Sequence, residues 1–169
     1  MEGIYEPALY FLVFLVGLDV GMEGVRNLKK VGKVGVVLPL ITVLGAIIAG
    51  IIGSVILNIP LKWALAITTG CGWYTLAGPL IAQYSAFYGT IGFVSNLIRE
   101  IMMVIGYPLG VKKISGKYLV TIGGASTMDS TLAIVEKYGT SEDSLIAFLH
   151  GFIVTMVVIF ILPIILQMP

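Results

Sequence analysis

The sequence has very little charge. Only 11% of its 169 residues are charged, whereas 58% are hydrophobic and the mean hydropathy is +1.04. A soluble domain carries about 25% charged residues, so this chain cannot cover a globule with polar groups. A soluble enzyme or binding module is therefore excluded. Ten Lys and Arg nearly balance nine Asp and Glu, which indicates neither a nucleic-acid partner nor a polybasic membrane-surface protein.

Cysteine and catalytic motifs are equally scarce. The single cysteine, Cys71, excludes an intrachain disulfide framework and a cysteine-rich metal site. The sequence contains no phosphate-binding P-loop, no His-Glu-x-x-His zinc motif and no Gly-x-Ser-x-Gly nucleophile elbow. We therefore expect a protein that is not an enzyme and that holds no cofactor or metal.

What the sequence does have is a series of long apolar runs separated by charged loops. A helix needs about 20 apolar residues to cross a bilayer. The pattern predicts an all-α polytopic membrane protein that forms a single membrane domain over residues 1–169. Acidic residues at the start argue against a secretory signal, so the first run is interpreted as a retained helix. The five to six expected hydrophobic segments are 7–21, 34–58, 63–88, 90–111, 118–136 and 144–167.

Two of these segments contain many helix breakers. Four of the ten residues from 70 to 79 are Gly or Pro, and Gly123 and Gly124 interrupt the fifth segment. Unpaired backbone at membrane depth is tolerated only where it is buried in protein or lines a wet cavity. We expect 70–79 and 123–126 to be non-helical, with helix resuming near Pro79 and near Thr127. Gly89 followed by Thr90 predicts the boundary between the third and fourth segments.

The basic loops predict the orientation. Residues 26–33 and 112–117 are both rich in Lys and Arg, which places both loops in the cytoplasm and the N-terminus outside. If 63–88 crossed the membrane fully, simple alternation would put 112–117 outside. A re-entrant 63–88, which enters and leaves on the outer side, removes that conflict, and we favour it over full crossing.

Ionisable side chains inside apolar segments are the functional candidates. Each costs roughly 2.5–3.5 kcal/mol even on mild scales and marks a functional site by default. Asp19 lies at the end of the first run, where headgroups can solvate it. His150 is slightly more typical of a packed neutral histidine than of a proton relay. Arg99 and Glu100 share a helix face with Asn96, which indicates either bonds to a neighbouring helix or a place in a translocation path.

Asp129 is the sharpest candidate. It follows two glycines and Ser126-Thr127-Met128. One interpretation is a capping box with Ser126 as the N-cap. The other is a half-helix that begins inside the membrane, where hydroxyls, including that of Ser130, and a carboxylate bind a polar solute. There the Asp129 carboxylate takes an ammonium or a proton, and the helix N–H groups take a carboxylate. We favour the second interpretation, which is compatible with the first.

Two further patterns leave alternatives open. Trp73, Tyr74 and Thr75 lie among the breakers of the third segment, where they form a wall for a ligand or anchor the chain at the membrane interface.

Small residues allow a neighbouring helix to approach closely, and the second segment carries a stripe of them. This stripe indicates either packing within one bundle or a dimer face. Its members are Ala46, Ala49, Gly50 and Gly53.

These motifs together resemble those of the lysine exporter family LysO, in the family's order and over nearly the whole chain. The resemblance implies export of L-lysine from the cytoplasm through the inner membrane, in exchange for protons, with Asp129 as a transport carboxylate. Two alternative functions stay open. One is a proton- or sodium-coupled carrier of another amino acid or an organic anion, and the other is a non-transporting scaffold subunit. The matching stretches are 14–17, 72–80, 95–100, 124–132 and 150–152.

One departure from the family affects the expected partners. Family members are usually longer, with further N-terminal helices that carry another acidic residue. The chain resembles the C-terminal half of a split exporter of the inverted-repeat type. The resemblance therefore implies a small membrane subunit that supplies the missing helices, or a homodimer, within the lipid bilayer.

Overall fold

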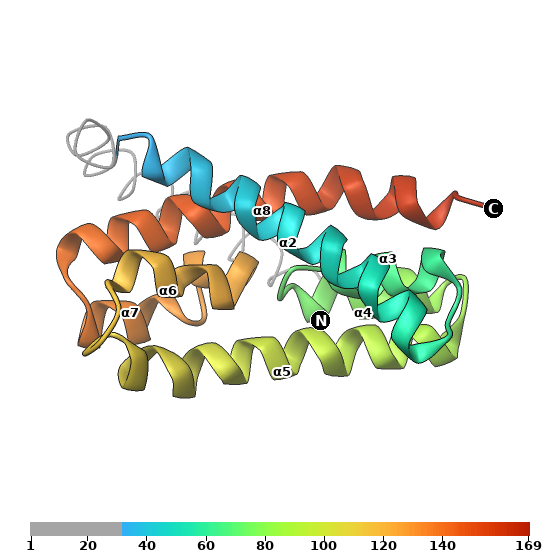
Figure 1. Cartoon of the computed structure of the whole chain (residues 1–169), viewed down its shortest axis with the longest axis horizontal. Helices are drawn as coiled ribbons and strands as arrows, with labels where there is room; N and C mark the ends of the chain where they lie inside the picture. The colour runs from blue at the N-terminus through green and yellow to red at the C-terminus, as the bar shows by residue number, and fades with distance from the viewer. Residues whose placement is uncertain (1–31) are drawn as a thin grey trace, which may run out of the picture. The chain divides into compact units, whose positions relative to one another are not determined.

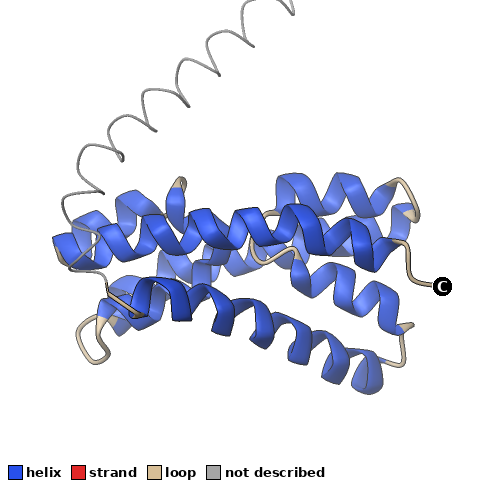
Figure 2. Ribbon diagram, turned by 90° about the horizontal axis from the view of Figure 1, so that it is seen from above, coloured by secondary structure: helices blue, strands red, loops and turns tan. Residues whose placement is uncertain are grey.

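The computed structural model describes residues 32–169. Within this range the chain forms seven α-helices and one short 3₁₀ helix, and Figure 2 shows no strand in it. The first predicted segment, Asp19 and most of the 26–33 loop lie outside the described residues. The helices are α2 (Val34–Leu57), α3 (Leu61–Thr69), α4 (Tyr74–Ala82), α5 (Ala86–Gly110), α6 (Gly116–Gly123), η1 (Gly124–Met128), α7 (Leu132–Tyr138) and α8 (Ser141–Leu166).

Within residues 32–169, three helices are long and apolar enough to cross a membrane. They are α2, α5 and α8, with 24, 25 and 26 residues, or roughly 36–39 Å at 1.5 Å per residue. Large apolar side chains point outward from them, such as Val55 at 79% exposure and Phe160 at 68%. Exposed apolar surface of this extent suits lipid. The predicted all-α polytopic membrane fold is confirmed in these helices.

The other helices form two hairpins, one at each end of the molecule. We call α3, residues 70–73 and α4 hairpin 1, and α6, η1, residues 129–131 and α7 hairpin 2. In Figure 1 hairpin 1 occupies the right half and hairpin 2 the left half, and each turns back near the middle. The buried core lies where hairpin 1 and the tip of hairpin 2 pack on α8.

Contacts between the ends of each hairpin show that both fold back on themselves. The ammonium of Lys62, at the start of α3, lies 6.0 Å from the ring centroid of Tyr84, just after α4. In hairpin 2, a Cβ added to Gly116 at the start of α6 would lie 2.7 Å from Asp143 Oδ2, just beyond α7. The predicted re-entrance of 63–88 stays a prediction, and it is compatible with this hairpin. The side of the membrane from which each hairpin enters stays a prediction.

The first break is shorter than expected. Only 70–73 is non-helical, because α4 begins at Tyr74 and contains Pro79. The two positive φ angles that turn the chain belong to Cys71 (48°) and Gly72 (89°). The prediction of non-helical structure up to Pro79 is wrong, since the turn is completed before the proline and proline's fixed φ is itself compatible with a helix.

The second break is longer than expected. Gly123 still belongs to α6 and residues 124–128 form a 3₁₀ helix, so the prediction that 123–126 is non-helical is wrong. Helix α7 begins only at Leu132, so the predicted restart near Thr127 is also wrong. The hydroxyl of Ser126 donates to Gly123 O (3.2 Å) and that of Thr127 to Gly124 O (2.8 Å). Bonds to the carbonyl three residues back favour the tighter turn.

The expected boundary at Gly89 and Thr90 is also wrong. Helix α5 begins at Ala86, after Ser85 in an extended conformation. Gly89 lies inside α5, where an added Cβ would lie 2.5 Å from the Cβ of Ala82. This glycine therefore permits close packing of α5 on α4 rather than ending a helix.

The small residues of α2 serve mainly internal packing. Ala46 is buried, and a Cβ added to Gly50 would lie 2.7 Å from the hydroxyl of Thr68 in α3. Gly53 has nothing within 4 Å of such a Cβ, and Ala49 is exposed. Packing within the bundle accounts for Ala46 and Gly50. For Ala49 and Gly53, a dimer face stays a prediction.

Candidate functional site

The tips of the two hairpins cross in direct backbone contact. The amide of Ala125 donates a 2.8 Å hydrogen bond to the carbonyl of Cys71. A Cβ on Gly72 would collide with the carbonyl of Gly123, and one on Gly124 with the carbonyl of Cys71. Both Gly72 and Gly124 also have positive φ, which side chains disfavour. The crossing requires glycine at both positions.

Asn96 of α5 satisfies the broken backbone of hairpin 1. Its side-chain oxygen accepts from Gly72 N (2.7 Å), and its amide nitrogen donates to Ile67 O (2.9 Å) and Gly92 O (2.8 Å). The residue is buried, so backbone groups left unpaired here would be costly. Asn96 thus fixes hairpin 1 against α5, which supports the interpretation of a bond to a neighbouring helix.

Arg99, one turn further along α5, does the same for hairpin 2. Its Nε donates to Ile122 O (2.7 Å) and its Nη2 to Thr121 O (2.9 Å). These carbonyls belong to the last turn of α6, which has no helical partner for them and carries a partial negative charge. The guanidinium therefore caps α6 at the centre of the molecule.

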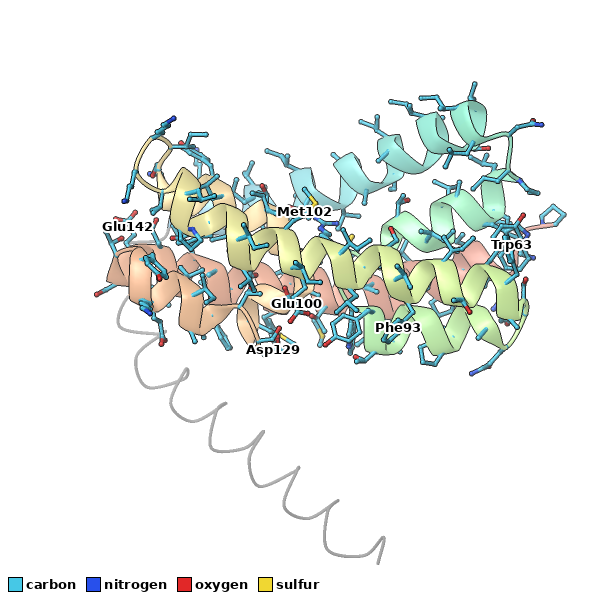
Figure 3. All side chains as sticks on the ribbon, turned by 90° about the horizontal axis from the view of Figure 1, so that it is seen from below. Trp63, Phe93, Glu100, Met102, Asp129 and Glu142 are labelled. Atoms are coloured by element: carbon cyan, nitrogen blue, oxygen red, sulfur yellow. The ribbon has the colours of Figure 1, made fainter. Side chains whose placement is uncertain are left out.

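A cavity of about 160 Å³ lies beside this crossing. It is formed by both hairpins together with α5 and α8. Figure 3 shows Glu100 and Asp129 near one another on this face. We call it the first cavity, and its wall consists of Gly72, Trp73, Tyr74, Thr75, Glu100, Ala125, Ser126, Met128, Asp129, Ser130 and Thr155.

The structure divides the predicted site residues into two groups. One group lines the first cavity: Trp73, Tyr74, Thr75, Glu100, Ser126, Asp129 and Ser130. The other group lies outside its wall: Asn96, Arg99, Thr127 and His150. The first group faces the space of the cavity, and the second makes hydrogen bonds to the hairpins or to neighbouring helices.

Two carboxylates give the first cavity its negative character. Asp129 is exposed in the turn after η1, where its Oδ1 accepts from the amide and, at 3.2 Å, the hydroxyl of Ser130. The predicted capping box at Ser126 and Asp129 does not form, because Ser126 bonds back to Gly123. Glu100 is half-buried on α5. A cavity with two carboxylates favours a cation.

The first cavity also contains a helix N-terminus. Tyr74 and Thr75 open α4, and no side chain caps that helix. The first N–H groups of a helix have no intrahelical partner and carry the positive end of the dipole. A carboxylate is stabilised at such a position. The wall therefore offers groups for an ammonium and for a carboxylate within one space.

His150 of α8 lies behind the wall of the first cavity. It is fully buried, with Nε2 2.8 Å from the hydroxyl of Thr42 in α2 and Nδ1 3.2 Å from that of Thr127 in η1. Both ring nitrogens are therefore satisfied. Its position joins α2 to the tip of hairpin 2.

Some functional positions were missed from the sequence. Thr155 completes the wall and contacts the sulfur of Met128 (3.7 Å). Gly151 lets the backbone of Met128 pack directly on α8. The sequence signal for Gly151 was its position directly after His150, which is the only ionisable residue in the middle of α8.

Comparison with known proteins decides the family. The family model for the lysine exporter LysO matches residues 1–166. The chain belongs to the lysine exporter LysO family. As a LysO member it belongs with transporters and not with enzymes, and it is a multi-pass membrane protein.

Two relatives support the match. Lysine exporter LysO of Escherichia coli (strain K12) is 31% identical over 156 residues, which cover 90% of this chain and 52% of that protein. A Haemophilus influenzae protein to which lysine export is ascribed is 31% identical over 151 residues, 88% of this chain and 76% of that protein. The chain thus spans about half the length of the E. coli relative. No solved structure matches it.

Proposed function

We propose that the chain is a component of a secondary transporter that exports L-lysine from the cytoplasm across the inner membrane in exchange for protons. Membership of the LysO family supports the substrate. The observation that carries the proposal is the first cavity, in which Asp129 and Glu100 face the same space as the open N-terminus of α4.

The first cavity offers a complementary group for each charge of lysine. The side-chain ammonium lies between the carboxylates of Asp129 and Glu100. The α-carboxylate meets the N–H groups at Tyr74 and Thr75, where the helix dipole is positive. The indole of Trp73 covers the apolar stem, since aromatic rings supply contact area and attract cations.

The first cavity disfavours the alternative of an organic-anion carrier. An anion would lie against two carboxylates, which repel a like charge. A sodium-coupled cycle differs from the proposal only in the driving gradient. A non-transporting scaffold would leave lysine fluxes unchanged.

The hairpins also support a two-part exporter. Hairpins that reach the middle from opposite ends, with their breaks apposed, are typical of inverted-repeat carriers. In a bilayer such breaks must be covered by protein or line a wet cavity. We propose that a small membrane subunit, or a second copy, covers the first cavity.

Lysine load in cells tests the proposed function. Cells that lack the chain are expected to accumulate lysine and to become sensitive to toxic lysine analogues, and restoring the chain with its partner reverses both. In cells with the chain restored, proton coupling is supported if lysine export responds to an imposed proton gradient and not to a sodium gradient. Unchanged lysine levels and analogue sensitivity in cells without the chain would support the scaffold reading.

A further inference from the structure

A second cavity of about 430 Å³ lies between α2, α3, α5 and α6, with polar side chains in a wall that is otherwise apolar. It shares no wall residue with the first cavity. Arg99 and Asn96 line it on α5, and Thr42 lines it on α2. We call it the second cavity, and the proposed lysine site makes no use of it.

His150 lies between the two cavities. Its Nε2 is 2.8 Å from the hydroxyl of Thr42, in the wall of the second cavity. Its Nδ1 is 3.2 Å from the hydroxyl of Thr127, which sits in the chain between two wall residues of the first cavity, Ser126 and Met128. The imidazole itself is completely buried.

The hydrogen bonds assign the proton of the neutral ring. The hydroxyl of Thr127 donates its one hydrogen to Gly124 O at 2.8 Å, so towards His150 it acts as an acceptor. Nδ1 must then carry the ring proton, and Nε2 must accept from the hydroxyl of Thr42. The basic nitrogen of His150 therefore communicates with the second cavity through a single hydroxyl.

We propose that His150 is the residue that holds the coupling proton, and that the second cavity is the route by which this proton reaches it. The inference rests on the proposed function. A proton from water in the second cavity moves to Thr42 Oγ1 while the hydroxyl's own proton moves to His150 Nε2, so one proton enters the ring and none is lost. The reverse transfer through Thr42 releases it.

The position of the charge gives the coupling its sign. The imidazolium lies one side chain from the tip of hairpin 2, whose residues Ser126 and Asp129 form the first cavity. A positive charge there disfavours a cation in that cavity. By reciprocity, bound lysine disfavours the proton. Mutual exclusion of proton and lysine is the condition for exchange.

Few titratable groups lie close to His150. Helix α2 and η1, which hold its two hydrogen-bond partners, carry no titratable side chain. From α5 the guanidinium of Arg99, fixed on the α6 carbonyls, acts on it with a positive charge that disfavours the imidazolium and so favours release of the proton, and Glu100 and Asp129 face the first cavity. The remaining titratable groups of α8 and of the other elements packed against it lie towards their ends: Lys62 in α3, Lys117 and Tyr118 in α6, Glu136, Lys137 and Tyr138 in α7, and Glu142 and Asp143 in α8.

The test separates lysine–lysine exchange from transport driven by a proton gradient. Membrane vesicles from cells that produce the exporter are loaded with lysine, and labelled lysine is followed with and without a pH gradient. His150→Gln keeps a polar group near Nε2 but cannot hold a proton. We expect gradient-driven transport to fall about tenfold or more, the size of a typical coupling free energy, while exchange stays near the wild-type rate.

Thr42 supplies the matched control pair. Thr42→Ser keeps the hydroxyl and should transport like the wild type, whereas Thr42→Val removes it and should behave like His150→Gln. Gradient-driven transport at the wild-type rate in His150→Gln overturns the proposal. If His150→Gln also loses exchange, the comparison of the two Thr42 variants becomes the test. Equal gradient-driven transport by Thr42→Ser and Thr42→Val would then overturn the proposal. Vesicles with wild-type protein that neither exchange nor accumulate lysine refute the proposed function instead.

Discussion

Asn96 and Arg99 lie one turn apart on α5, and each serves one of the two hairpins. Asn96 pairs the free backbone groups of hairpin 1, and Arg99 pairs the last carbonyls of α6. The sequence singled them out because polar groups in apolar segments are rare. Their partners could not be predicted, because no spacing relates position 96 to 72 or position 99 to 122.

Replacement of Asn96 by leucine is expected to destabilise the fold. The buried amide of Gly72 and the carbonyl of Ile67 lose their partner, and each unsatisfied group costs about 1–3 kcal/mol. Thermal unfolding in detergent should shift to markedly lower temperature. Val94→Ala, on an exposed position of the same helix, is the control and should change little. Equal stability of the two variants would contradict the role assigned to Asn96.

At the scale of elements, glycines in the sequence predicted where the two hairpins are interrupted, but they did not predict how long each interruption is. Breaker composition located both interruptions, at 70–73 and 124–131. Pro79 was taken as part of the first break because proline usually ends helices, yet its place in α4 follows from a turn already completed at Cys71 and Gly72. The 3₁₀ turn of hairpin 2 depends on two hydroxyl bonds that propensities do not encode.

The crossing of the hairpins predicts which glycines are essential. Gly72→Ala and Gly124→Ala place a Cβ against a facing carbonyl and strain a positive φ, which alone costs about 1–3 kcal/mol. Both variants should lose stability and lysine export. Gly53→Ala, where an added Cβ meets nothing within 4 Å, should retain both. Wild-type export by Gly72→Ala at matched protein levels would refute the direct backbone contact.

At the largest scale, the three long helices alternate with the two hairpins along residues 32–169. If the loop at 112–117 is cytoplasmic, as its lysines predict, hairpin 2 enters from the cytoplasm and hairpin 1 from outside. The loop and the C-terminus lie at opposite ends of Figure 1. If each hairpin enters and leaves on one side, the predicted segments 63–88 and 118–136 do not cross the membrane, because a hairpin has the composition of a crossing helix without its length.

This orientation is tested with single cysteines. Starting from a Cys71→Ser chain, a cysteine at Lys113 should react with a membrane-impermeant thiol reagent only after the membrane is opened. A cysteine at Gln167 should react in intact cells. The reverse pattern would invert the orientation, and reaction of both positions in intact cells would contradict the arrangement of the helices.

A two-part exporter predicts a complex in the membrane. Extraction in mild detergent followed by mass measurement should give a species larger than one 18.1 kDa chain, with a small membrane protein favoured over a second copy. The partner covers backbone breaks that lipid cannot satisfy. A stable monomer that exports lysine from liposomes unaided would contradict this expectation.

The charge of Asp129 is the most direct test of the central claim, that the first cavity binds lysine. Asparagine at position 129 keeps the oxygen that accepts from the amide of Ser130, so the turn persists while the charge is removed. The measurement is lysine export at matched membrane levels for wild type, Asp129→Asn and Asp129→Glu. A lost charged hydrogen bond is worth about 1.5–3 kcal/mol, so export by the Asn variant should fall roughly ten- to hundredfold, with partial activity in the Glu variant. Export by Asp129→Asn at the wild-type rate would contradict the account.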